Sequence, residues 1–175
     1  KQQDLFTLNY GTFEDELNML SLSENADIHS YLYMQDGFFY ISNSEAKKVM
    51  QFTSYGDIIG VFYNKDYNPT PSFESAKSSD LQVQKSTQQA LNYPFNKIGK
   101  IVSDNKKNWY VVDHLPIERQ EFDAENELDL KQVILRFSED GKFIDYLGQQ
   151  GPGGTPFSFV KDIYTNANNE LIVVC

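Results

Sequence analysis

The sequence lacks the features that mark several classes of protein. Its 175 residues include one cysteine, Cys175, which excludes an internal disulfide framework and a cysteine-rich zinc site. No apolar run approaches the ~20 residues that a membrane-spanning helix requires. Basic residues are scarce, since 15 Lys and Arg stand against 25 Asp and Glu, for a net charge of −10. Because phosphate binding requires clustered basic side chains, this composition argues against a nucleic-acid ligand and against electrostatic attachment to an anionic membrane.

Helical patterns are also rare. Few windows place apolar residues at the i, i+3, i+4 and i+7 spacing of an amphipathic helix. Short runs rich in Tyr, Phe, Val and Ile, bounded by Gly, Asn, Asp and Ser, dominate instead. With 40% hydrophobic and 14% aromatic residues, the chain can build a packed core. The sequence therefore predicts an all-β fold.

An internal repeat runs through the chain. Each unit contains a strand, a polar turn, an aromatic or β-branched strand, another turn, a strand that ends in Phe and a Gly-containing turn. This order predicts four-stranded antiparallel meanders, the blades of a β-propeller. The chain would contain about two and a half blades in a single propeller domain, at residues 26–64, 96–148 and 160–175.

Two polar insertions lengthen the repeat beyond the ~40–50 residues of one propeller blade. The first, residues 65–93, is rich in Ser and Gln, and the second, residues 114–131, is rich in carboxylates. We expect each insertion to form a loop or an extended hairpin that projects from its blade.

The stretch from Phe137 to Val174 resembles an NHL-type propeller repeat. A strand ending in Phe137 meets the turn Asp140-Gly141, and a Gly-rich crossover, residues 151–154, leads to the next strand pair. The second strand of that repeat usually ends in Asp, and the corresponding positions here hold Asn43, Asp113 and Cys175. The resemblance implies that the chain is a fragment of a six-bladed propeller, with Leu5–Tyr10 as an outer strand that enters the first blade.

Three segments are more specifically similar to a family of uncharacterised spirochaetal envelope proteins. They are residues 45–48, 55–57 and 145–156. This resemblance implies a location in the bacterial cell envelope or periplasm, with a lipid anchor in the full-length protein. It implies no particular chemistry.

The acidic insertion is the most conspicuous candidate site. Its carboxylates are Glu118, Glu121, Asp123, Glu125, Glu127 and Asp129. Alternation from Asp123 to Asp129 would place four of them on one face of a strand, where they would be solvated. Oxygen ligands of this kind also suit a divalent cation such as Ca²⁺, but the glycine that an EF-hand loop requires is missing. A solvated hairpin is favoured, and no cofactor is predicted.

Taken together, these features favour a non-enzymatic scaffold that binds a protein partner through its two insertions. The acidic insertion would select a basic partner. One alternative, implied by the NHL resemblance, is a metal-dependent lyase or lactonase whose ligands would be Asn43, Asp113 and Glu170. Another alternative is a module that binds glycan or peptidoglycan, which would need an exposed aromatic platform.

The apolar segment Leu171–Cys175 and the segment Leu5–Tyr10 would be unpaired blade edges in so short a chain. Such edges invite pairing with another strand. We expect them to be covered either by further sequence or by a second copy, which would give a homodimer through strand exchange.

Overall fold

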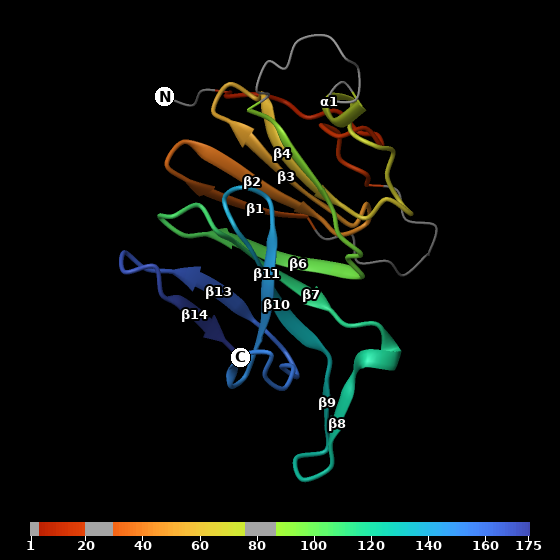
Figure 1. The fold of residues 1–175 in the computed structure, drawn as a ribbon, viewed down its shortest axis with the longest axis vertical. Helices are drawn as coiled ribbons and strands as arrows, with labels where there is room; N and C mark the ends of the chain where they lie inside the picture. Colours follow the sequence, from red (N-terminus) through yellow and green to blue (C-terminus); the bar gives the residue numbers. More distant parts are fainter. Residues whose placement is uncertain (1–3, 20–29, 76–86) are drawn as a thin grey trace. The chain divides into compact units, whose positions relative to one another are not determined.

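The computed structural model describes residues 4–19, 30–75 and 87–175, which form an all-β protein (Figure 1). The prediction of an all-β protein is confirmed, and the sheets formed by these residues are open ladders. Helix in the described ranges is limited to α1 (Ser72–Ser75) and the 3-10 turn Ile117–Arg119, and neither helix is long enough to cross a membrane. The chain divides into two compact units, Lys1–Phe95 (unit 1) and Asn96–Cys175 (unit 2).

Unit 1 contains a five-stranded sheet in the order β1-β2-β3-β4-β5. Its strands are β1 (Ser30–Gln35), β2 (Phe38–Asn43), β3 (Lys48–Thr53), β4 (Ile58–Tyr63) and β5 (Gln89–Asn92). Strands β1 to β4 form an antiparallel meander, as the repeat predicts. The β1–β2 turn uses Asp36 and Gly37, both with positive φ (52° and 80°), a conformation that Asp and especially Gly tolerate.

Strand β5 pairs in parallel with β4, and Val61 lies opposite Ala90. It belongs to the predicted insertion 65–93, of which residues 76–86 lie outside the described ranges. The end of this insertion is therefore part of the sheet and not a projecting hairpin. Its partly buried Ala90 packs against the apolar cluster of the sheet, and this burial offsets part of the entropy lost in closing the long connection from β4.

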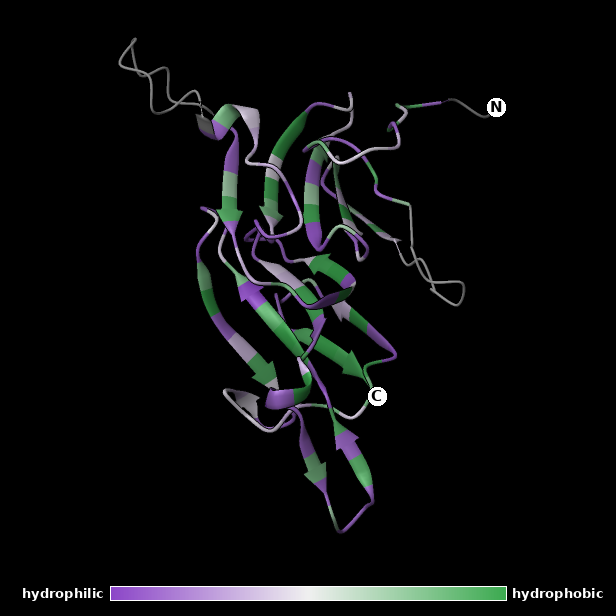
Figure 2. Ribbon diagram, turned by 90° about the vertical axis from the view of Figure 1, so that its right-hand side faces the viewer, coloured by the Kyte–Doolittle hydropathy of each residue, from purple (hydrophilic) through white to green (hydrophobic). Residues whose placement is uncertain are grey.

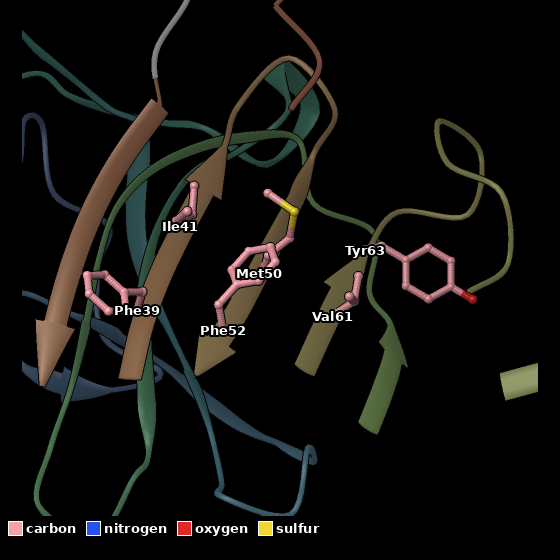
Figure 3. Close-up of a cluster of buried hydrophobic side chains, with 6 residues drawn as sticks. All are labelled: Phe39, Ile41, Met50, Phe52, Val61 and Tyr63. Atoms are coloured by element: carbon pink, nitrogen blue, oxygen red, sulfur yellow. The ribbon is translucent and has the colours of Figure 1, made fainter. Parts of the chain in front are cut away.

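One cluster of buried apolar side chains in unit 1 lies on one face of this sheet (Figure 3). Side chains point to opposite faces at successive strand positions, so the apolar residues at every second position gather on one side. They are Phe39, Ile41, Met50, Phe52, Val61 and Tyr63. Met50 and Phe52 have no exposed surface.

The segment Leu5–Tyr10 covers this face, and the prediction that it forms an outer strand is wrong. Residues 4–9 form no ladder, and Tyr10 makes only an isolated bridge to Leu17. Phe6 instead packs on the face of the sheet, with its ring centroid 5.3 Å from Phe39 and 5.7 Å from Phe52. Burial of Phe6 and Leu8 against the core outweighs the backbone pairing that the sheet edge would provide.

Unit 2 contains a second five-stranded sheet, in the order β12-β11-β10-β7-β6. Its strands are β6 (Lys97–Ser103), β7 (Trp109–His114), β10 (Gln132–Phe137), β11 (Phe143–Gly148) and β12 (Gly151–Pro152). Two hairpins complete the unit, namely β8 (Glu121–Asp123) with β9 (Leu128–Leu130), and β13 (Asp162–Thr165) with β14 (Leu171–Val174). Trp109, Ile134 and Phe137 are fully buried in it.

The two sheets repeat the same arrangement of side chains. Tyr40 on β2 lies opposite Gln51 on β3, and Tyr110 on β7 lies opposite Arg136 on β10. One residue further along the third strand of each meander, the side chain is a fully buried Phe, Phe52 or Phe137. Two of the repeat units are thus four-stranded antiparallel ladders of matching pattern.

Lys48 is an unusual core residue, because a lysine with 1% exposure must lose most of its hydration. Its Nζ donates a hydrogen bond to the carbonyl oxygen of Phe13 at 2.5 Å, which ties the N-terminal segment to β3. Burial lowers the pKa of Lys48 to about 8, and the nearby carboxylates of Asp15, Glu16 and Glu14 only partly oppose this shift.

The stability of unit 1 should therefore increase at alkaline pH. The folded chain holds the Lys48 proton less tightly than the unfolded chain, whose lysine has the ordinary pKa of 10.5, so deprotonation favours folding. We expect the free energy of unfolding to rise by about 2 kcal/mol between pH 7 and pH 9.5 relative to Lys48→Met, measured by urea denaturation. The variant Lys65→Met, at an exposed position, should follow the original chain. If the free energy of unfolding depended on pH in the same way for all three proteins, the pH dependence could not be assigned to Lys48.

Candidate functional site

The acidic insertion contains the hairpin β8–β9, which extends away from the ends of β7 and β10 in unit 2 (Figure 1). Its cross-strand pairs are Glu121 with Leu130, Phe122 with Asp129, and Asp123 with Leu128. The expectation that Asp123, Glu125, Glu127 and Asp129 line one strand is wrong. β8 ends at Asp123 and β9 begins at Leu128, so the turn interrupts the alternation, and Glu127 within it takes a positive φ of 53°.

The pairing gives the hairpin two different faces. Cross-strand partners share a face and successive residues alternate. One face therefore carries Glu121, Asp123, Leu128 and Leu130, and the opposite face carries Phe122 and Asp129. Each face combines carboxylates with apolar side chains, and Figure 2 shows this mixture along both strands.

Asp123 has a structural role in the turn. Its Oδ1 accepts hydrogen bonds from the backbone N–H groups of Glu125 (3.0 Å) and Asn126 (3.1 Å), and its Oδ2 accepts one from Asn126 Nδ2 (2.8 Å). The side-chain hydrogen bond from Asn126 is the main reason that the pKa of Asp123 is lowered. Asp123 therefore stays ionised while it closes the turn.

The other carboxylates of the insertion are exposed to solvent. They are Glu118, on the 3-10 turn, and Glu121, Glu125, Glu127 and Asp129. Within the described ranges, no ion pair involves any of them. Phe122 and Ile117 lie among these charges with 64% and 86% of their surface exposed. The acidic insertion thus presents two large apolar side chains among exposed carboxylates, Ile117 on the 3-10 turn and Phe122 on the hairpin.

An open groove of about 360 Å³ lies at the base of the hairpin. Its lining combines the Leu-bearing face of the hairpin with the crossover after β11 and the end of β14: Asp123, Asn126, Leu128, Leu130, Gln149, Phe157, Ser158 and Cys175. These positions are far apart in sequence and meet because the ends of β7, β11 and β14 lie at the same edge of unit 2. Composition gave no signal for this groove.

Gln132 holds the crossover in place beside the groove. Its backbone exchanges hydrogen bonds with Phe157, and its Oε1 accepts one from the backbone N–H of Val160 at 2.5 Å. The amide is thereby oriented so that Nε2 faces His114 Nε2, 2.5 Å away, and can donate to the neutral imidazole. Burial, with Lys97 and Lys131 nearby, also lowers the pKa of His114. Phe157 is therefore set firmly in the groove wall.

Asn43, the first of the alternative metal ligands, is fully buried in unit 1. Its Oδ1 accepts a hydrogen bond from the backbone N–H of Asn18 (2.8 Å), and its Nδ2 donates to the carbonyl oxygen of Asn18 (2.9 Å). This side chain therefore imitates a strand partner for one residue of the N-terminal segment.

Asp113 and Glu170, the other two, are in unit 2. Asp113 is buried, and its carboxylate accepts hydrogen bonds from the backbone N–H groups of Asn96 and Lys97 at the start of β6 (2.8 Å for Lys97). Glu170 is exposed and accepts a hydrogen bond from Asn166 Nδ2 at 2.6 Å. The described ranges contain no group of three or more His, Cys, Asp or Glu side chains placed to hold a metal ion.

Asn43 and Asp113 occupy corresponding positions in the two meanders, and both side chains hydrogen-bond to backbone groups. Asn43 is the last residue of β2 and Asp113 the last but one of β7, and each side chain binds the backbone of another segment of its unit. Asp suits the two N–H donors in unit 2, whereas Asn suits the N–H and C=O pair that Asn18 offers in unit 1. This difference explains why the repeat position changes from Asp to Asn.

Comparison with known proteins gives no family assignment. No family model matches the chain, and no curated protein matches it at a significant level.

Proposed function

We propose that this chain is a non-enzymatic protein-interaction module, and that hairpin β8–β9 is its contact element. The observation that carries the proposal is the exposure of Phe122, 64% of whose surface is accessible, on a hairpin bordered by carboxylates without ion-pair partners in the described ranges. Large aromatic side chains supply much of the binding energy of protein interfaces.

The charge of the hairpin indicates the kind of partner. Residues 121–130 contain five carboxylates and no basic residue. A basic partner surface would be attracted to them, and salt would weaken this attraction because the charges are exposed. Phe122 would then supply the apolar contact that exposed ion pairs alone do not provide.

A β-propeller is the architecture we propose for the scaffold. The two matched meanders, β1–β4 and β6-β7-β10-β11, support blades of this type, with β13–β14 as the start of a third within a six-bladed ring. The NHL-like relationship and the location in a bacterial envelope stay predictions from the sequence.

Selection of peptides from a phage-displayed random library on the immobilised chain tests this function. We expect the selected peptides to be rich in Lys and Arg together with apolar residues. They should bind the variant Phe122→Ser at least tenfold more weakly. This factor corresponds to a loss of about 1.4 kcal/mol of binding free energy, as expected when a side chain that contributes much of the binding energy is removed. Binding should also weaken when NaCl is raised from about 50 to about 500 mM.

The matched control is Tyr55→Ser, which removes an aromatic side chain with 87% exposure from unit 1. This variant should bind the selected peptides as the original chain does. Peptides that bind the original chain, Phe122→Ser and Tyr55→Ser equally would rule out the Phe122 face of the hairpin as the contact surface.

A further inference from the structure

The groove beside the hairpin offers a more specific contact than the exposed face of Phe122. Its walls include Leu128 and Leu130 from β9 and Phe157 from the crossover, and its volume of about 360 Å³ falls within the range of small binding sites. Leu130 and Phe157 are 6% and 8% exposed, whereas Leu128 is 46% exposed. The groove walls therefore include two buried apolar side chains and one that is open to solvent.

Backbone hydrogen bonds hold the segments that line the groove. Leu115 N–H donates to the Lys131 carbonyl oxygen at 2.7 Å, which joins the two chain segments at the base of the hairpin. Phe157 N–H donates to the Gln132 carbonyl oxygen, also at 2.7 Å. A site held in this way loses little conformational entropy when a ligand enters it.

The electrostatic character of the groove is negative. Asp123 lies in its wall on the same face as Leu128, and no Lys or Arg is among the lining residues. Glu125 and Glu127, in the adjoining turn, add further negative charge. A side chain that enters the groove is therefore favoured if a cation lies next to it.

We propose that this groove binds an apolar side chain of a partner peptide in which a neighbouring Lys or Arg is placed against Asp123. The inference rests on the proposed interaction function and specifies the chemistry of the partner: an extended segment in which a large apolar residue is next to a basic one. Apolar burial between Leu128, Leu130 and Phe157 supplies affinity, and Asp123 selects for the adjacent cation.

Cys175 provides a direct measurement of occupancy. It is the only cysteine, it is exposed, and it lines the groove, so its rate of alkylation by iodoacetamide reports whether the groove is filled. The probe is an acetylated pentapeptide with leucine in the centre and lysine at the other four positions. The control peptide has alanine in the centre and the same charge, so it has the same electrostatic effect on the thiol.

We expect saturating leucine peptide to slow alkylation of Cys175 at least threefold and the alanine peptide to leave it nearly unchanged. Leu128→Ser should abolish the protection, and Asp123→Asn, which keeps an acceptor for the turn, should raise the peptide concentration required severalfold. The circular dichroism of both variants should match that of the original chain, because Leu128 is half exposed and Asn also forms such turns.

Either of the following outcomes would overturn the inference. Equal protection by the leucine and alanine peptides would mean that charge alone acts at Cys175. Protection that increases with protein concentration in the absence of peptide would mean that a second copy of the chain occupies the groove.

The inference and the proposed function can fail separately. Library peptides that depend on Phe122 but leave alkylation unchanged would remove the groove from the interface and retain the hairpin. If the leucine peptide protects Cys175 but the library peptides bind Phe122→Ser as well as the original chain, the groove is retained as a binding site and the Phe122 face is rejected.

Discussion

Replacement of Phe52 by alanine is expected to reduce the free energy of unfolding of unit 1 by about 3–5 kcal/mol, the usual cost of truncating a buried Phe. The ring is fully buried in the core of β2, β3 and β4 and also contacts Phe6, so its removal leaves a cavity between the sheet and the N-terminal segment. Urea denaturation followed by circular dichroism measures the loss.

Two controls make this prediction specific. Tyr55→Ala, at a position with 87% exposure, should change stability by no more than about 0.5 kcal/mol. Trp109, the only tryptophan, lies in unit 2, so its fluorescence follows that unit independently. A loss below about 1 kcal/mol for Phe52→Ala would show that the N-terminal segment moves to fill the space.

The second large effect is expected for Asn43→Asp, which replaces the side-chain amide nitrogen by an oxygen. The carboxylate would still accept the Asn18 N–H but would place a buried negative charge against the Asn18 carbonyl oxygen, where Nδ2 now donates. An unpaired buried charge of this kind should cost about 3 kcal/mol at pH 8.

The cost should nearly disappear in acid, because the protonated carboxyl group introduced at position 43 can donate to the carbonyl oxygen as the amide does. The folded state raises the pKa of this carboxyl above its unfolded value of ~3.9. The contribution of the protonated carboxyl to the free energy of unfolding is therefore fully present below that value and is lost as pH rises through the folded pKa. Urea denaturation of Asn43→Asp and the original chain at each pH isolates this difference. A cost that is the same at pH 4.5 and pH 8 would refute the assigned hydrogen bonds.

The meanders could be predicted from the sequence because their information is local. Alternating apolar residues place Phe39, Ile41, Met50 and Phe52 on one face, and turn residues such as Gly37 separate the strands. The strand that ends in Phe137 and the turn at Gly141, with φ of 76°, were equally visible.

The remaining features depend on contacts between distant residues. Leu5–Tyr10 has the composition of a strand, but packing of Phe6 on Phe39 decides its place. In the acidic insertion, the alternation of carboxylates predicts a continuous strand, but a turn lies between Asp123 and Leu128. The signal for this turn is the pair Asp123 and Asn126, three residues apart, whose side chains hydrogen-bond to each other. The groove needs three strand ends to meet, which no local pattern encodes.

The parallel pairing of β5 with β4 has a consequence for the order of folding. Successive strands of the β1–β4 meander are joined by turns of a few residues, whereas Gly60 on β4 meets Gln89 on β5 across a much longer stretch of chain. Closing this loop costs more entropy before any contact compensates for it, so we expect the meander to form first and β5 to attach last. Until then, the edge of β4 is open to other strands, and the attachment of β5 limits how long unit 1 is exposed to aggregation.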